Sequence, residues 1–182
     1  ASGRDANLIA PVLMKVRNEI RPLRFTSAPV ASASEAAYFR YYGLDTKCDE
    51  HLFGSFRVHE KVLAAHVFRM TDARGTVILV HGYYDHAGVL RHIISDLVDR
   101  GYTVAVYDQP GHGLSSGERA AIGDFSEYVE VFEAFLELCR SKLPAPSHVV
   151  AHSMGCAVVM DSLLQSPRTT IGRTVFLAPL IR

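Results

Sequence analysis

The sequence lacks several features that would point to particular classes of protein. It has no tryptophan, only three cysteines in 182 residues, and 19 basic residues that balance 19 acidic ones. This balance gives no electrostatic reason to expect a nucleic-acid partner. No apolar run approaches the roughly 20 residues that a membrane-spanning helix needs. With 48% hydrophobic residues, the chain is expected to be globular with a buried core.

The cysteines and histidines show no pattern of a metal or redox site. Cys48, Cys139 and Cys156 are widely spaced and form no CxxC pair, so we expect three reduced, mostly buried thiols and a cytoplasmic protein. His148 and His152 are four residues apart, but on a predicted strand and turn rather than on a helix, which excludes a zincin pair. We expect neither a metal nor a cofactor.

Residues 1–50 are expected to form a peripheral N-terminal arm with short helices. Val12, Val16 and Ile20 recur at four-residue spacing, which predicts a short amphipathic helix ending before Pro22. Pro11 interrupts the apolar stretch ahead of it. This arm is a candidate for peripheral contact with a membrane surface, although no motif establishes such contact.

A second short helix is predicted in the same region. Ser32 and Glu35 have the spacing of a capping box, and Gly43 follows Tyr42 where the helix would end.

Residues 51–182 are expected to form the core of an α/β fold. A hairpin is predicted over 53–58 and 62–68, followed by strands at 76–80, 102–107, 148–151 and 174–178. Between them lie predicted helices over 89–98, from Asp124 (with Glu127) to Pro144, and over 154–165 before Pro167. Strands and helices that alternate in this way predict a mostly parallel sheet with helices on both faces.

The strongest chemical signal is the segment Ala151-His152-Ser153-Met154-Gly155, between a predicted strand and a predicted helix. A nucleophilic serine at such a sharp turn needs small residues two before and two after it, and Ala151 and Gly155 meet this need. The alternative is a serine that only caps a helix, but the strand and helix on either side favour the nucleophile.

The segment His81-Gly82-Tyr83-Tyr84 follows the predicted strand over 76–80. Acyl transfer requires two fixed donors for an oxyanion, which are usually backbone N–H groups. We expect these donors to be the amides of Tyr83 and Met154. Gly82 would allow a close approach of the backbone, and His81 would fix the turn rather than act in catalysis. His81, Gly82, His152 and Gly155 are thus expected to support the loops or bind substrate.

Three segments together indicate a family. VHGYYDHAG, YDQPGHGLSSGERAAI and AHSMG occur in this order, and their joint occurrence is far more specific than any one of them. The chain thereby resembles the monoacylglycerol lipase and lysophospholipase group of α/β-hydrolases, which is of the serine aminopeptidase S33 type. The resemblance implies a serine esterase acting on a fatty-acyl ester, with a lid over an apolar pocket. It implies Ser153 as nucleophile and Tyr83 and Met154 as oxyanion donors.

The general base and its acid partner are missing. In this fold they follow the serine, but after Ser153 the sequence contains one acid, Asp161, and no histidine. Asp161 is eight residues along the next helix, about 12 Å away, so it cannot orient a base at Ser153. His112 is an upstream alternative that would break the family's order. We therefore expect that the chain holds only the N-terminal part of the fold, and that a longer polypeptide carries the lid, the catalytic Asp and the catalytic His.

Three functions remain open from the sequence. The leading one is hydrolysis of a lysophospholipid or monoacylglycerol through an acyl-enzyme on Ser153. An amide-cleaving aminopeptidase of the same fold is a close alternative. A non-catalytic binding domain is the alternative if the polypeptide ends at Arg182. Dehalogenase or epoxide chemistry is disfavoured, because an aspartate would then occupy the position of Ser153.

Overall fold

The computed structural model describes residues 3–166 and 171–180. Its helices are α1 (Gly3–Glu19), α2 (Ala33–Tyr42), α3 (Arg91–Asp99), α4 (Ser126–Lys142) and α5 (Met154–Gln165), and a short 3-10 helix, η1 (Ala87–Leu90), precedes α3. Its strands are β1 (Glu50–Val58), β2 (Lys61–Arg69), β3 (Thr76–Val80), β4 (Thr103–Tyr107), β5 (Ser147–His152) and β6 (Thr174–Leu177).

Within the described residues the strands form one sheet in the order β1-β2-β4-β3-β5-β6. The hairpin β1–β2 is antiparallel and joins β4 in antiparallel fashion, whereas β4, β3, β5 and β6 run parallel to one another. The expected mostly parallel α/β sheet is confirmed. Parallel neighbours place their carboxyl ends at one edge of the sheet, where sites are built in such folds.

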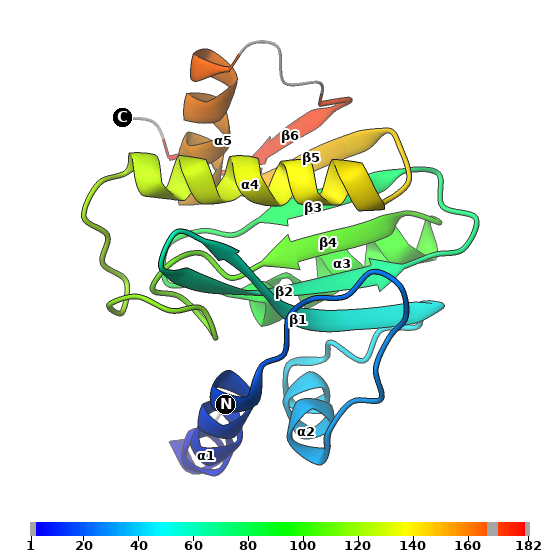
Figure 1. Ribbon diagram of the computed structural model, residues 1–182, viewed down its shortest axis with the longest axis vertical. Coiled ribbons are helices and arrows are strands. Elements are labelled where there is room, and N and C mark those ends of the chain that lie inside the picture. Colours follow the sequence, from blue (N-terminus) through cyan, green and yellow to red (C-terminus); the bar gives the residue numbers. More distant parts are fainter. Residues whose placement is uncertain (1–2, 167–170, 181–182) are drawn as a thin grey trace.

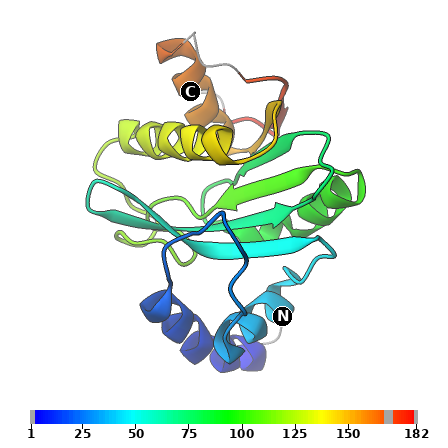
Figure 2. The same cartoon turned by 45° about the vertical axis from the view of Figure 1, so that its right-hand side comes forward.

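Helices cover both faces of this sheet. In Figures 1 and 2, α4 and α5 lie on one face, while α1, α2 and α3 lie on the other. Residues of β3 alternate between the two sides: Ile78 and Val80 join the core under α4 and α5, and Val77 and Leu79 join the opposite core. Burial on both sides explains why the strand is a continuous apolar run.

Of the two helices predicted in the N-terminal region, α2 forms as expected and α1 differs from the prediction. The helix α1 begins at Gly3 and runs through Pro11, which was expected to interrupt the apolar stretch. A proline inside a helix removes one backbone hydrogen bond, but tertiary packing of an apolar face supplies most helix stability. Here Ile9 and Val16 are buried against the rest of the protein.

The helix α2 shows the predicted caps. The Ser32 hydroxyl accepts from the Glu35 N–H, the Glu35 carboxylate accepts from the Ser32 N–H, and Gly43 adopts a left-handed conformation with φ of 65°. At α4 the predicted pair also forms, since the Glu127 carboxylate accepts from the Asp124 N–H at 3.1 Å, although the helix itself begins at Ser126.

The cysteines and the bounds of α5 agree with the sequence. Cys48, Cys139 and Cys156 are free thiols, and the last two are buried, as predicted. The helix α5 has its predicted bounds, whereas Pro167, expected to close it, lies outside the described residues. None of the helices in the described part is both long and apolar enough to cross a bilayer.

Candidate active site

Strand register brings the three sequence motifs to one edge of the sheet. Val80, the last residue of β3, pairs with Ala151 of β5, and Leu79 pairs with Val106 of β4. The segments that follow these strands therefore start side by side. As a result, the His81-Gly82 turn, the loop from Asp108 and the Ser153 turn adjoin one another.

Ser153 occupies a strained turn between β5 and α5. Its backbone has φ of 50° and ψ of −117°, a combination that side chains with a Cβ rarely adopt. The turn is held by neighbours, because the Ser153 N–H donates to the Leu177 carbonyl at 3.0 Å, and the Ser153 carbonyl accepts from the N–H groups of Cys156 and Leu180. A strained residue that its surroundings hold in place is typical of a functional site.

Gly155 allows α5 to lie directly against the end of β3. A Cβ at this position would stand 2.4 Å from the Val80 carbonyl oxygen and 2.7 Å from that of His81. No side chain fits there, which is the physical reason for a glycine two residues after the serine. The close packing aims the positive N-terminal end of α5 at the turn.

The turn after β3 approaches the serine equally closely. A Cβ on Gly82 would lie 3.0 Å from the Cβ of Ser153 and 3.1 Å from the His152 Nδ1. Among the described residues, the amide N–H groups of Tyr83 and Met154 have no hydrogen-bond acceptor. The Met154 amide directly follows the serine, and the Tyr83 amide follows Gly82, whose backbone lies against the serine.

His81 is a structural part of this turn. Its Nε2 accepts from the Gln109 N–H at 2.9 Å, so Nδ1 carries the proton and donates to the Gly82 carbonyl at 2.7 Å. The side-chain amide of Gln109 donates to the His81 carbonyl at 2.6 Å. Complete burial lowers the pKa of His81 to about 4, so the ring is neutral near pH 7.

His152 ties the serine turn to the segment after β3. Its Nδ1 lies 3.2 Å from Oδ2 of Asp85. This contact spans 67 residues of sequence and joins the residue before Ser153 to the segment that carries Tyr83. The sequence motifs did not reveal Asp85.

Asp108 was also missed as an organising residue. It is buried directly after β4, and its carboxylate accepts from the N–H groups of Ala87 at 2.8 Å and Leu114 at 2.9 Å. Its carbonyl accepts from the Ser115 hydroxyl. An acid immediately after a buried strand was the available signal, and its role is to hold two loops at this edge.

No base for Ser153 appears in the described part of the chain. Ser153 Oγ has no hydrogen-bond partner there. His112 is buried, and its Nδ1 donates to the Pro110 carbonyl at 2.8 Å, with no hydrogen bond to the serine. Asp161 lies two turns along α5. The described residues also contain no cluster of His, Cys, Asp or Glu that could hold a metal ion.

The sequence of this edge matches a known family. Residues 71–182 match the family described as serine aminopeptidase, S33. The chain belongs to this family. The matched range contains the Ser153 turn, the His81-Gly82 turn and the Asp108 loop.

Curated relatives of the chain include monoacylglycerol lipases. The chain is 40% identical over 90 residues to the monoacylglycerol lipase of Mycolicibacterium smegmatis, which covers 49% of this chain and 32% of that protein. It is 27% identical over 109 residues to the human monoglyceride lipase, covering 59% of this chain and 36% of the relative. The chain thus spans about a third of the length of these curated relatives.

Solved structures confirm the α/β-hydrolase fold. The monoacylglycerol lipase of Paleococcus ferrophilus superimposes with a TM-score of 0.56 at 29% identity, over 64% of this chain and 43% of that one. A hydrolase from Thermoplasma acidophilum gives a TM-score of 0.61 at 21% identity, over 72% of this chain and 64% of that one. The shares covered are consistent with a part of the fold.

Proposed function

We propose that this chain carries the nucleophile and oxyanion hole of a serine hydrolase that cleaves fatty-acyl esters of the monoacylglycerol or lysophospholipid type. The observation that carries the proposal is the strained backbone of Ser153. The turn after β3 lies against it, since a Cβ on Gly82 would stand 3.0 Å from the Cβ of Ser153. A turn that only linked a strand to a helix would have no need of this strain. The relatives named as monoacylglycerol lipases support the choice of substrate class.

The proposed reaction uses Ser153 Oγ to attack the acyl carbonyl carbon. The carbonyl oxygen becomes an oxyanion, which the amides of Tyr83 and Met154 bind while the N-terminal end of α5 adds favourable potential. The serine proton passes to a histidine base and then to the departing alcohol, and water later releases the fatty acid from the serine. The proposal places this base and its acid partner in the part of the relatives' length that this chain does not span.

A second candidate is cleavage of an aminoacyl amide. The description of the matched family, serine aminopeptidase, favours it. The same nucleophile and oxyanion donors would act, with an amine as leaving group.

The test labels the full-length protein with a fluorophosphonate and locates the adduct by mass spectrometry. We expect one adduct on Ser153, and its loss in Ser153→Ala together with at least about a 10³-fold drop in esterase activity. Ser141→Ala is the matched control, because that hydroxyl donates to the Leu138 carbonyl on the surface of α4. An unlabelled protein, or full activity in Ser153→Ala, would contradict the proposal.

The substrate class is tested with three compounds on the same protein. A monoacylglycerol and a lysophosphatidylcholine represent the lipid esters, and an aminoacyl anilide represents the amide. A higher kcat/KM for either lipid ester supports the leading proposal. A higher value for the anilide supports the aminopeptidase alternative.

A further inference from the structure

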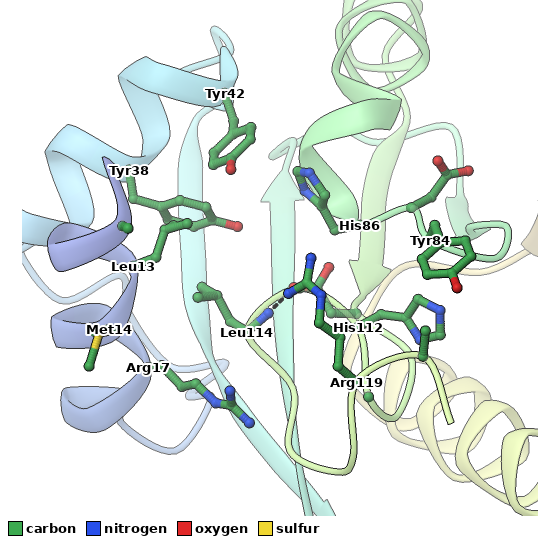
Figure 3. A pocket seen from close by; sticks show the side chains of 16 residues that line it. Leu13, Met14, Arg17, Tyr38, Tyr42, Tyr84, His86, His112, Leu114 and Arg119 are labelled. Atoms are coloured by element: carbon green, nitrogen blue, oxygen red, sulfur yellow. Dashed lines mark hydrogen bonds between the residues drawn. The ribbon is translucent and has the colours of Figure 1, made fainter. Parts of the chain in front are cut away.

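A cavity of about 310 Å³ lies between the N-terminal helices and the loops at the sheet edge. Figure 3 shows α1 and α2 on one side and the loop that carries Arg119 on the other. Its volume falls at the lower end of the range for small-molecule pockets, roughly 300–1,000 Å³. Ser153 is not among its lining residues.

Arg119 is a cation without a partner in this cavity. Its guanidinium has no hydrogen bond or ion pair within residues 3–166 and 171–180, and Figure 3 places it in the middle of the lining side chains. Arg17 stands at the edge of the cavity and donates to the Ser115 carbonyl at 3.2 Å. A guanidinium offers five N–H donors that suit a carboxylate or a phosphate.

Two hydroxyl groups from α2 face the same space. Figure 3 shows the hydroxyls of Tyr38 and Tyr42 directed into the cavity. Burial raises the pKa of both phenols, so both are protonated donors near pH 7. Arg119 and Tyr42 both line this cavity.

A chain of hydrogen bonds behind Tyr38 permits its hydroxyl to donate. Tyr38 Oη lies 3.2 Å from Nε2 of buried His66, and His66 Nδ1 lies 3.0 Å from Nε2 of His51. When His51 donates to His66, the His66 Nε2–H donates to Tyr38, and the phenol proton is then free to point into the cavity. An anion in the cavity would favour this arrangement.

The two carboxylates of the lining already bind protein groups through three of their four oxygens. Both oxygens of Asp108 accept backbone N–H groups, and Asp85 is paired with His152. Among the described lining side chains, Arg119, Tyr38 and Tyr42 offer donors, whereas His112 Nε2, buried without a hydrogen-bond partner, offers an acceptor. Leu13, Met14 and Leu114 add an apolar wall beside them.

We propose that this cavity binds the oxyanion head group, carboxylate or phosphate, of a small amphiphile, with Arg119, Tyr42 and Tyr38 as donors and the apolar wall against its alkyl chain. This binding goes beyond the proposed function, because it requires no reaction at Ser153. A ligand here would contact Asp85, whose partner His152 precedes Ser153, so the site is placed to influence the serine turn.

The test measures binding by calorimetry to the full-length protein carrying Ser153→Ala, so that hydrolysis plays no part. The probes are octanoate, octyl phosphate, octanol and inorganic phosphate. We expect an octyl anion to bind at least about tenfold more tightly than octanol and inorganic phosphate. The tighter of octanoate and octyl phosphate identifies the head group as carboxylate or phosphate.

Variants locate the site. Arg119→Gln is expected to weaken binding of the octyl anion at least about tenfold, and Tyr42→Phe and Tyr38→Phe by smaller factors. Arg57→Gln is the matched control, since Arg57 is exposed on β1 and outside the cavity lining. If Tyr38→Phe fails to fold, Arg119→Gln and Tyr42→Phe decide. Unchanged affinity in both, or equal affinity for octanol, would overturn the proposal, whatever the activity of Ser153.

Discussion

His152 Nδ1 and Asp85 Oδ2 lie 3.2 Å apart and join the serine turn to the segment that follows β3. The side chains are 40% and 23% exposed, so solvent screens their attraction. The contact therefore contributes alignment more than stability.

Breaking this contact should loosen the site more than it destabilises the fold. We expect Asp85→Ala and His152→Ala each to lower the unfolding free energy by about 1 kcal/mol or less, with a coupling of a few tenths. Fluorophosphonate labelling of Ser153 should slow in both, because one of the contacts that align the segment after β3 with the serine turn is lost. A double-mutant cycle in urea gives the coupling. Labelling rates equal to those of the unchanged protein would refute a positioning role.

Gly155→Ala tests the close packing of α5 on β3. The added methyl would meet the Val80 carbonyl oxygen at 2.4 Å, so we expect a loss of about 1–3 kcal/mol or a failure to fold. Chemical denaturation measures the loss. Leu164→Ala, at a position 80% exposed on the same helix, serves as the control and should change stability by less than about 0.5 kcal/mol. A neutral Gly155→Ala would show that the helix can shift.

Acid should destabilise the protein through its buried histidines. Burial lowers the pKa of His51 and of His81 to about 4, and that of His66 well below its usual value. The unfolded chain binds these protons at about pH 6.5 while the folded chain does not, so stability falls as pH decreases from about 6.5 to 4. For His81 alone we expect a loss of about 2 kcal/mol at pH 5.

One variant and one control can show whether buried histidines cause the dependence of the unfolding free energy on pH between about 6.5 and 4. His51→Phe keeps a ring between Phe39 and Phe68, whose centroids are both 4.4 Å away, and removes one proton site, so the slope should decrease. His59→Gln, on the exposed hairpin turn, should leave the slope as it was. Equal slopes in all three proteins would mean that other groups govern acid unfolding.

Replacing Ser153 by glycine should raise stability while it removes the nucleophile. Glycine adopts φ of 50° and ψ of −117° without a Cβ clash, so relief of about 1 kcal/mol or more is expected. The urea midpoint measures the gain. Ser162→Gly, at a buried position inside α5, should instead lower the unfolding free energy. It removes a hydrogen bond to Glu133 and makes the backbone of the unfolded chain more flexible. A destabilised Ser153→Gly would contradict the assigned strain.

Local patterns in the sequence predicted much of the fold. The capping box of Ser32 and Glu35, and the bounds of α5, depend on residues close in sequence, and both are confirmed. The helix α1 begins earlier than predicted, because burial of Ile9 and Val16 against distant elements outweighs the effect of Pro11.

Contacts between distant segments could not be read in the same way. The pairing of Asp85 with His152 and the cavity between Tyr38 and Arg119 both depend on how separate elements dock. The spacing of apolar residues predicts which face of a helix or strand is buried, but it does not predict which loop will pack near that helix or strand. The motifs did indicate the segments that meet at Ser153, because a parallel sheet brings its carboxyl ends together.

The pairing of Val80 with Ala151 also determines when the serine turn can exist during folding. These strands are joined through a long intervening stretch that includes β4 and α4, and such distant pairings form slowly because the chain must first close a large loop. Until these strands pair, Gly82 does not contact Ser153, and Val80 does not pack against Gly155. Reactivity of the serine toward a fluorophosphonate therefore reports a late step of folding. It should appear only when β3 and β5 have paired, after the circular dichroism signal of helices such as α4 has developed.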